Sequence, residues 1–401
     1  MSAEEKSRFY AEDREDMPSQ PGSPEGAPPE ASRPEAALFR AERLEGEACR
    51  KLRPLWEEVF YEDSKEFTDY YFREKAHRNH GYVLRKGEAA AAMLYLSPYP
   101  MMIRTGDSFS CREINYIVGV ATKAEYRHRG CMDRLLKEAL QDMYGKGHPF
   151  TFLMPADPEI YYPYQFAYIY SRAERCMPRR LNGGFRLCGS LGSGTDLRHL
   201  ADFARNCLER DYDMFIRRDE AYFGLMEKEL KAQRGGIYLK EGTNGIEGYY
   251  LYTQEGEKRE VQEAVFSGEE PWEDCPMGRA ETVKPVIMAR IADVRAMLSL
   301  LRAEEEVRLD ISVADPILTG NCGVWECFFS EKRAEIAKKD ARRKHPCGLA
   351  VSIEALTAWI FGYGETEACF RFAGTAGEKK ELQNKLYKIK RLGRVLLNEI
   401  V

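Results

Sequence analysis

The sequence lacks the features that mark several specialised classes of protein. It has no run of about 18 or more apolar residues, so it predicts no membrane-spanning helix and no membrane partner. Its net charge of −5 provides no basic excess, which argues against nucleic acid as the main partner. None of its eleven cysteines forms a CxxC pair, and its six histidines have no cysteine or carboxylate partner at metal-ligand spacing. We therefore expect no zinc ribbon, no thioredoxin motif and no metal.

Two further absences bear on the cellular compartment. The acidic N-terminal region has no apolar core of the kind that secretory signal peptides contain. Eleven scattered thiols in a chain of 401 residues fit a reducing cytosol better than a disulfide framework. We therefore expect a cytoplasmic protein.

The composition is that of a large folded chain with an atypical start. With 401 residues, 44% of them hydrophobic, the chain predicts two or three domains and a substantial core. Residues 1–36 hold six of the nineteen prolines and little apolar surface, which predicts a disordered leader. A glycine-rich break closes a first unit, 37–185. A second unit then spans 186–280 and a third spans 281–401.

The predicted elements of the first unit form a mixed α/β layer. A hairpin is expected over 81–103 with its turn at Lys86–Gly87, followed by a strand over 111–122. Apolar residues at helical spacing predict an amphipathic helix from 132 to 143, and a buried strand follows at 149–156. The second unit repeats this order of helices and strands. In the third unit we interpret the basic run 331–345 as a solvated helix face.

The most informative stretch, residues 119–140, passes from a buried strand to the amphipathic helix through a basic turn. Arg127, His128 and Arg129 occupy this turn, and Gly130 ends it. The N-terminus of a helix carries unpaired N–H groups and partial positive charge, so it suits anions. Glycine lets a ligand approach the backbone, and guanidinium groups add forked donors. The pattern favours a phosphate-bearing ligand, although a solvated basic turn before an ordinary helix remains an alternative.

The turn resembles motif A of the GNAT N-acetyltransferases, a valine-rich strand followed by (Arg/Gln)-x-x-Gly-x-(Gly/Ala). Arg127 and Gly130 match the motif, whereas Met132 replaces a small residue. In that family the strand and turn amides hold acetyl-coenzyme A, so the resemblance implies acetyl-CoA as cosubstrate. The residues implied to bind it are Val120, Ala121, Thr122, Arg127, His128, Arg129, Gly130, Cys131 and Met132.

A more particular resemblance covers residues 38–401. The turn, the segment "LMPADPEIYYPYQFAY", a second GNAT-like unit without the turn, "MARIADV" and the terminal "NEIV" are similar to the enhanced intracellular survival (Eis) family. This resemblance implies an α/β (α+β) fold of tandem GNAT mixed sheets with flanking helices, plus a C-terminal sterol-carrier-like α/β domain. The catalytic GNAT domain would then be 37–185, the second GNAT-like domain 186–280 and the sterol-carrier-like domain 281–401. It also implies a homo-oligomer that acetylates amines of small polycations such as aminoglycosides, or lysines.

The Eis family uses a tyrosine as general acid within the pattern Ile-Tyr-x-x-(Phe/Tyr)-Gly-(Phe/Tyr). Residues 160–166 match it, with Gln165 in place of the glycine. The resemblance therefore implies Tyr161 as the acid, and a register shifted by one residue would give Tyr162. Packing or hydrogen-bonding roles for these tyrosines are the alternative.

The family's base is the main-chain carboxylate at the C-terminus, which the resemblance places on Val401 in this chain. The apolar tail around it is expected to dock, and docking alone would explain its composition. A carboxylate of pKa about 3.5 suits an anchor for water-mediated deprotonation better than a strong base. Asp63, Glu66 and Asp69 are candidates for an acidic acceptor cleft that favours a polycation, or they are ordinary helix charges.

Two other functions remain open from the sequence. One is a non-catalytic, regulatory acyl-CoA-binding protein, because Met132 and Gln165 both depart from the family patterns. The other is lipid carriage by the C-terminal domain, whose apolar helices would line either a lipid cavity or a filled core.

Overall fold

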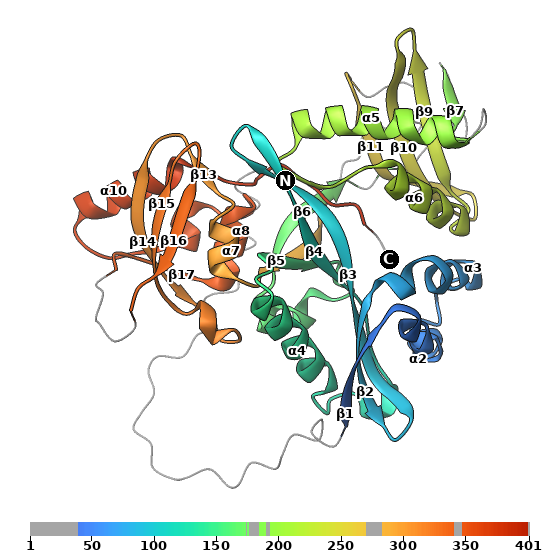
Figure 1. Ribbon diagram of the computed structural model, residues 1–401, viewed down its shortest axis with the longest axis horizontal. Helices are drawn as coiled ribbons and strands as arrows, with labels where there is room; N and C mark the ends of the chain where they lie inside the picture. Colours follow the sequence, from blue (N-terminus) through green and yellow to red (C-terminus); the bar gives the residue numbers. More distant parts are fainter. Residues whose placement is uncertain are drawn as a thin grey trace.

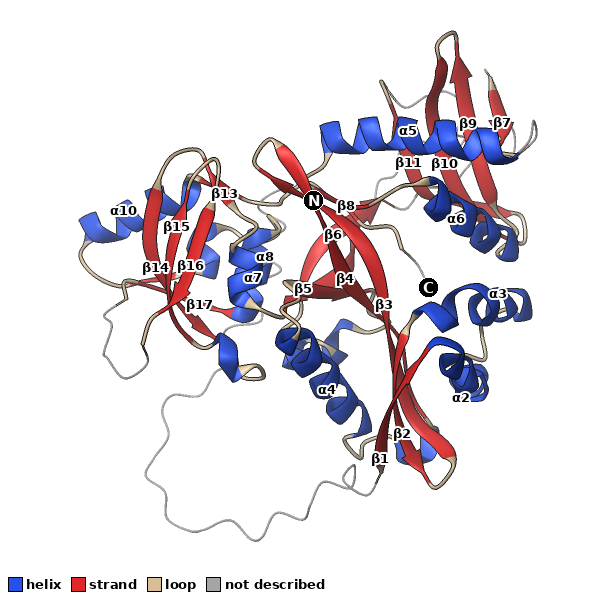
Figure 2. Ribbon diagram, viewed as in Figure 1, coloured by secondary structure: helices blue, strands red, loops and turns tan. Residues whose placement is uncertain are grey.

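The computed structural model describes residues 39–173, 175, 184–189, 193–269, 283–340 and 347–399 (Figure 1). The expected leader, 1–36, and the terminal Val401 lie outside these residues. Three larger β-sheets, each with helices packed against it, make up the described chain (Figure 2). The predicted α/β class with mixed sheets is confirmed.

The largest sheet has nine strands and lies at the centre of the molecule (Figure 1). Its main path runs β1-β2-β3-β4-β5-β12-β6, and the far end of β3 also pairs with β8, which pairs with β20. Only β4 with β5 and β8 with β20 are parallel neighbours. The strands are β1 (Arg40–Glu45), β2 (His80–Lys86), β3 (Ala89–Thr105), β4 (Ser108–Thr122), β5 (Phe150–Leu153), β6 (Ala167–Ala173), β8 (Met214–Ile216), β12 (Val283–Ile291) and β20 (Val395–Leu396).

The local predictions for this sheet are confirmed. The expected hairpin is the antiparallel pair β2–β3, which turns at Gly87 with a left-handed φ of 61°. The amphipathic helix is α4 (Cys131–Gly145), and its predicted apolar stripe is buried against the sheet except at Met132, which is half-buried. Helices α2 (Arg53–Val59) and α3 (Lys65–Tyr70) lie on the other side (Figure 1). Each buried leucine or methionine of α4 contributes about 1.5–3 kcal/mol relative to exposure, which holds the helix on the sheet.

The second sheet is antiparallel, in the order β11-β10-β9-β7. Two helices pack on it, and α6 also touches the first part of the chain, where the Tyr70 hydroxyl donates to the Leu225 carbonyl at 3.2 Å. The elements are β7 (Phe185–Leu187), α5 (Ser193–Asp211), α6 (Glu220–Ala232), β9 (Gly236–Gly242), β10 (Gly245–Glu255) and β11 (Lys258–Phe266).

The third sheet has five strands in the order β16-β15-β14-β17-β18. The basic run 331–345, interpreted from the sequence as a helix face, instead contains strand β16 paired antiparallel with β15. The helix interpretation was wrong because so short a run has no clear period, and the neighbouring strand decides its conformation. The elements are α7 (Val294–Leu298), β13 (Arg302–Ala303), β14 (Val307–Ala314), β15 (Gly323–Phe329), β16 (Ala334–Lys338), β17 (Leu349–Ser352), α8 (Ile353–Ile360), α9 (Thr366–Cys369), β18 (Arg371–Phe372), α10 (Ala376–Tyr387) and β19 (Ile389–Lys390).

The central sheet takes strands from all three units predicted along the chain. β12, from the start of the third unit, inserts between β5 and β6. β8, from the second unit, pairs with the end of β3, and β20, near the end of the chain, pairs with β8. The predicted boundaries therefore stay predictions, and the units are joined by shared sheet hydrogen bonds rather than by linkers alone.

Candidate active site

The site begins where two parallel strands of the central sheet stop pairing. β4 and β5 share only the pairs Asn115–Thr151 and Tyr116–Phe152, and β4 then continues to Thr122 while β5 ends at Leu153. On the β5 side, the last residues of β4 therefore have no strand partner within the described residues. Such an edge offers N–H and C=O groups to an extended ligand that carries amides.

A β-bulge in β4 lies within this unpaired stretch. The register between β3 and β4 changes so that Gly119 and Val120 face the single residue Leu94. Gly119 has φ +61°, and a Cβ there would lie 2.5 Å from the Trp56 ring of α2. Only glycine fits this conformation and this contact, and the bulge bends the strand next to the gap.

The basic turn follows directly and leads into α4. His128 and Gly130 both adopt left-handed conformations, with φ of 60° and 76°. The first N–H groups of a helix have no intrahelical acceptor, and the N-cap of α4, Gly130, has no side chain that could accept from them. Arg127 is exposed, and its Nε donates to the Thr122 carbonyl at 3.4 Å. The Arg129 guanidinium lies 6.0 Å from the Tyr126 ring centroid.

The predicted cofactor residues fall into two groups by burial. Ala121 and Cys131 have buried side chains, so only their backbone groups can serve a ligand. Met132 is half-buried and packs against the core, where it fills space below the turn. The exposed members, which offer side chains or a bare backbone, are Arg127, His128, Arg129 and Gly130; Val120 and Thr122 are half-buried.

Tyr161 lies in the segment after β5, between two 3₁₀ turns, η7 (Pro158–Ile160) and η8 (Tyr162–Tyr164). Its side chain is buried at 8% exposure, and its ring meets the Phe166 ring edge-on at 5.8 Å. Burial raises the pKa of the Tyr161 phenol to about 12, because the charged phenolate would lose its hydration. The hydroxyl makes no hydrogen bond within the described residues, so the proton is not committed to a structural partner.

Two contacts fix this tyrosine segment, one to the first turn of α4 and the other to β12. The Tyr164 hydroxyl donates to Asp133 Oδ1, in the first turn of α4, at 3.1 Å. The Arg290 Nε of β12 donates to the Tyr164 carbonyl at 2.8 Å, while its Nη2 pairs with Asp315 at 2.6 Å. Arg290 is fully buried, and neither contact was expected from the sequence. The structure thus brings the predicted acid segment next to the predicted cofactor turn.

Gln165 explains one departure from the family pattern. It caps η8 in the left-handed region with φ 62° and ψ 36°. A glycine adopts this conformation without strain, whereas a residue with a Cβ pays about 1–2 kcal/mol. The turn that positions Tyr161 therefore keeps the backbone conformation that the glycine of the pattern provides.

The tail that precedes Val401 is docked, although Val401 itself lies outside the described residues. Val395 and Leu396 form β20 alongside β8, and Leu397 is buried. Glu399 is 2% exposed, and its Oε1 accepts from Arg218 Nη1 at 2.7 Å. Sequence analysis missed Arg218; the one available signal was a glutamate within a mostly apolar tail.

The three acidic residues suggested for the acceptor cleft are mostly engaged locally. Trp56 Nε1 donates to Asp63 Oδ2 at 2.8 Å, and burial raises the pKa of this carboxyl group. Asp69 pairs with Arg53 of α2 at 2.5 Å. Glu66 is exposed. Two of the three therefore serve contacts between α2 and the segment around α3.

Two other kinds of site are absent from the described part of the chain. No helix there is both long enough and apolar enough to cross a membrane. No group of three or more His, Cys, Asp or Glu side chains there is arranged to hold a metal ion.

Comparison with known families identifies two domains. Residues 40–169 match the acetyltransferase (GNAT) domain, and residues 294–389 match the sterol carrier protein domain. The first match spans the unpaired end of β4, the basic turn, α4 and Tyr161. The chain therefore contains a GNAT acetyltransferase domain, which makes it an acyltransferase with an acyl-CoA as cosubstrate. No curated protein matches the chain.

Several solved structures share the fold at low sequence identity. A protein of unknown function and probable N-acyltransferase from Enterococcus faecalis V583 aligns with a TM-score of 0.69 at 18% identity, covering 89% of this chain and 98% of that one. A GCN5-related N-acetyltransferase from Kribbella flavida gives 0.65 at 17%, covering 90% and 98%. Eis1 from Mycobacterium abscessus gives 0.64 at 14%, covering 90% and 99%. Each of these alignments covers most of the chain. The similarity is one of fold.

Proposed function

We propose that this acyltransferase is an acetyl-CoA-dependent N-acetyltransferase with the organisation of the Eis family, acting on amines of small polycations such as aminoglycosides, or on lysines. One observation carries the proposal: Tyr164 ties the Tyr161 segment to the first turn of α4. A buried phenol and a phosphate-binding helix end thus belong to one site. The similarity in fold to Eis1 from Mycobacterium abscessus supports the same layout.

The cosubstrate is held along β4 and the turn. Backbone N–H groups around Gly130 receive the pyrophosphate, with Arg127 and Arg129 as flanking cations. The pantetheine arm carries amides and pairs with the free edge of β4 between Ile117 and Thr122. This arrangement carries the thioester toward the point where β4 and β5 separate.

Tyr161 donates the proton that the leaving thiolate needs. The neutral acceptor nitrogen attacks the thioester carbonyl, the C–S bond breaks, and the sulfur takes the Tyr161 proton. The proton that the acylated nitrogen then loses returns Tyr161 to the phenol form. Because burial raises the Tyr161 pKa to about 12, the phenol is fully protonated at neutral pH. Complete transfer to a free thiolate, pKa about 8.5, would be uphill by about 5 kcal/mol. The proton must therefore move as the C–S bond breaks, in concert with it.

The acceptor must lose a proton before it attacks, since its amine is an ammonium ion at neutral pH. The carboxylate of Val401 serves as an anchor for a water that takes this proton, rather than as a strong base. The docked residues before it, Val395 to Glu399, support delivery of the terminus into the site. Assembly into a homo-oligomer is part of the same family-based proposal.

A panel of amines tests the proposal. The full chain is incubated with acetyl-CoA and monoamines, linear polyamines, aminoglycosides or a lysine peptide, and released coenzyme A is titrated as free thiol. We expect thiol release that is strongest with polycationic acceptors. Tight acetyl-CoA binding without release with any amine would favour the regulatory, non-catalytic alternative.

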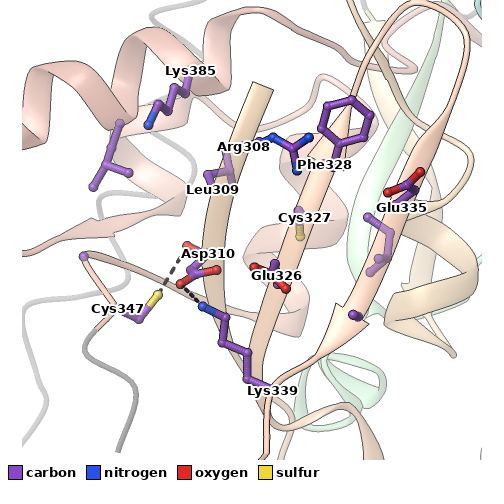
Figure 3. A pocket seen from close by; sticks show the side chains of 14 residues that line it. Arg308, Leu309, Asp310, Glu326, Cys327, Phe328, Glu335, Lys339, Cys347 and Lys385 are labelled. Atoms are coloured by element: carbon purple, nitrogen blue, oxygen red, sulfur yellow. Dashed lines mark hydrogen bonds and ion pairs between the residues drawn. The ribbon is translucent and has the colours of Figure 1, made fainter. Parts of the chain in front are cut away.

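Lipid carriage by the C-terminal domain is less well supported. A hollow of about 560 Å³ lies against β14, β15 and β16, and Figure 3 shows charged side chains along it. Lys339 Nζ pairs with Asp310 Oδ2 at 2.6 Å, and Glu326 lies beside them, while the Arg308 guanidinium lies over the Phe328 ring. Burying such charges under an alkyl chain is costly, so this hollow disfavours an apolar lipid. Lipid that copurifies with the protein would favour carriage.

A further inference from the structure

A cluster of buried charged side chains joins the second sheet to the end of the chain. Arg218 follows β8, and its side chain is fully buried. Its Nη2 pairs with Glu263 Oε2 of β11 at 2.6 Å, and its Nη1 pairs with Glu399 Oε1 at 2.7 Å. The Tyr222 ring of α6 packs on the guanidinium at 4.2 Å. Asn398 Nδ2 donates to Glu263 Oε2 at 3.2 Å, so both tail residues are fixed to this cluster.

A second buried ion pair lies at the same junction. Lys75 Nζ pairs with Glu229 Oε2 of α6 at 2.6 Å, and the Tyr70 hydroxyl donates to the same oxygen at 3.0 Å. Together the two pairs contain the three carboxylates of Glu229, Glu263 and Glu399 but only two cations, Lys75 and Arg218. One negative charge is therefore left without a cation among the described residues. A buried charge without a partner is costly by several kcal/mol, so the site favours a cationic ligand.

The hydrogen-bonding capacity that the Glu399 carboxylate leaves unused can be assigned to one of its two oxygens. Glu399 Oε1 takes both donors, Arg218 Nη1 at 2.7 Å and the Tyr222 hydroxyl at 3.0 Å. Glu399 Oε2 is buried and has no hydrogen-bond partner within the described residues. Both donors bind the same oxygen of the Glu399 carboxylate. They therefore fix the orientation of the carboxylate and the direction in which Oε2 points.

The Glu399 carboxylate acts electrostatically on two tyrosines at the place where β4 and β5 separate. Tyr116 forms the last pair with β5, and its ring stacks on Phe152 at 4.9 Å. The ring centroid of Tyr99, on β3, lies 6.3 Å from the ring centroid of Tyr116. Burial raises the pKa of both hydroxyls, and the negative charges of Glu229 and Glu399 add to the effect at Tyr99, as Glu399 does at Tyr116. Glu399 thus acts on the side chains that border the gap in the sheet.

We propose that Glu399 Oε2 is the docking position for a non-reacting ammonium group of the acceptor, and that Arg218 is the residue that positions it. The inference rests on the proposed function, because it places this position within the acceptor site of the same reaction. The inference also gives the second sheet and its helices a role. The second unit has no basic turn like the one at Gly130, but it supplies the residues that hold Glu399. The ligand class is an amine with at least two ammonium groups.

The test compares two amines that differ by one charge. The full chain, loaded with coenzyme A, is titrated by calorimetry with 1,4-diaminobutane and with 1-aminobutane. We expect wild type to bind the diamine about ten- to one hundred-fold more tightly, as a hydrogen bond to a charged group allows. Glu399→Gln should abolish this preference. The matched control, Glu260→Gln on β11, removes the same charge from a carboxylate paired with Arg172 and should keep the preference.

Further variants separate docking from folding. Glu399→Asp keeps the charge on a shorter side chain and should lose only part of the preference. Arg218→Lys should lower the preference for the diamine without changing coenzyme A affinity, because a single ammonium cannot hold both carboxylates in place. Thermal melting of each variant reports folding, and Glu399→Asp decides the matter if Glu399→Gln unfolds.

The outcomes distinguish this inference from the proposed function. Equal binding of both amines to wild type, or a preference that survives in Glu399→Gln, overturns the docking position, whatever the acetylation assay shows. A preference lost in Glu399→Gln supports the docking position even if no thiol is released with any acceptor, and in that case the proposed function alone fails.

Discussion

Replacing Tyr161 with phenylalanine removes the proposed acid while leaving its surroundings in place. The ring keeps its edge-on contact with Phe166 at 5.8 Å. The lost hydroxyl makes no hydrogen bond within the described residues, so no donor or acceptor there loses its partner. We therefore expect the free energy of unfolding to change by no more than about 0.5 kcal/mol. Acyl-CoA affinity should be unchanged, because the basic turn around Gly130 is proposed to bind the pyrophosphate without help from the Tyr161 hydroxyl.

The catalytic effect should be far larger than the structural one. Loss of a positioned general acid lowers the rate by about 10²- to 10⁴-fold, equivalent to about 2.7–5.4 kcal/mol in the barrier. The measurement is single-turnover thiol release from limiting acetyl-CoA bound to excess enzyme, with a saturating amount of the best acceptor of the panel, which isolates the chemical step. Calorimetry with coenzyme A and a thermal melt of the same preparation complete the comparison.

Neighbouring tyrosines provide matched controls. Tyr162→Phe tests the shifted register, and it should retain near wild-type turnover. Tyr164→Phe loses the hydrogen bond to Asp133, which costs about 0.5–1.5 kcal/mol, and should alter both acyl-CoA binding and turnover modestly. Unchanged turnover in Tyr161→Phe, or a large loss in Tyr162→Phe alone, would remove Tyr161 from the mechanism.

Three other predictions concern the tail, the left-handed turn and alkaline stability. Adding one glycine after Val401 moves the terminal carboxylate by about 3.5 Å and should lower kcat at least about tenfold with unchanged acyl-CoA affinity; full activity would exclude a role for that carboxylate. Gln165→Gly should raise the free energy of unfolding by about 0.5–1 kcal/mol in a urea titration, because it relieves the φ of 62°; a loss of stability would contradict this. Burial raises the Tyr161 pKa to about 12, whereas the pKa of a tyrosine in the unfolded chain is about 10. The contribution of the neutral phenol to the free energy of unfolding is therefore fully present below pH about 10 and is lost as the pH rises toward 12. Between about pH 10 and 12 the free energy of unfolding should therefore fall by about 2–3 kcal/mol more for wild type than for Tyr161→Phe. Parallel curves of unfolding free energy against pH for the two proteins would refute the raised pKa.

The features that the sequence predicts well are local ones. The apolar spacing of α4 and the turn at Gly87 come from interactions among residues a few positions apart, so their patterns are visible in the chain. The basic turn at Gly130 is of the same kind. Its left-handed φ and its place at the start of α4 agree with the reading of a glycine that opens a helix to a ligand.

What the sequence could not predict depends on contacts between distant segments. β12 inserts between β5 and β6 from more than a hundred residues away, and no local pattern selects its partners. Arg218 meets Glu399 across a separation of 181 residues, and their pairing depends on the docking of β20 beside β8. The side chains are ordinary ones for exposed positions, and only the assembled fold buries them. The bond between Tyr164 and Asp133 belongs to the same group.

The central claim is that the turn around Gly130 holds the pyrophosphate of the acyl-CoA, and a crystal structure of the full chain with coenzyme A tests it most directly. The account predicts pyrophosphate oxygens about 3 Å from the backbone nitrogens of residues 129–132, with the pantetheine arm along the free edge of β4. A coenzyme A molecule bound with its pyrophosphate away from this turn would contradict the account.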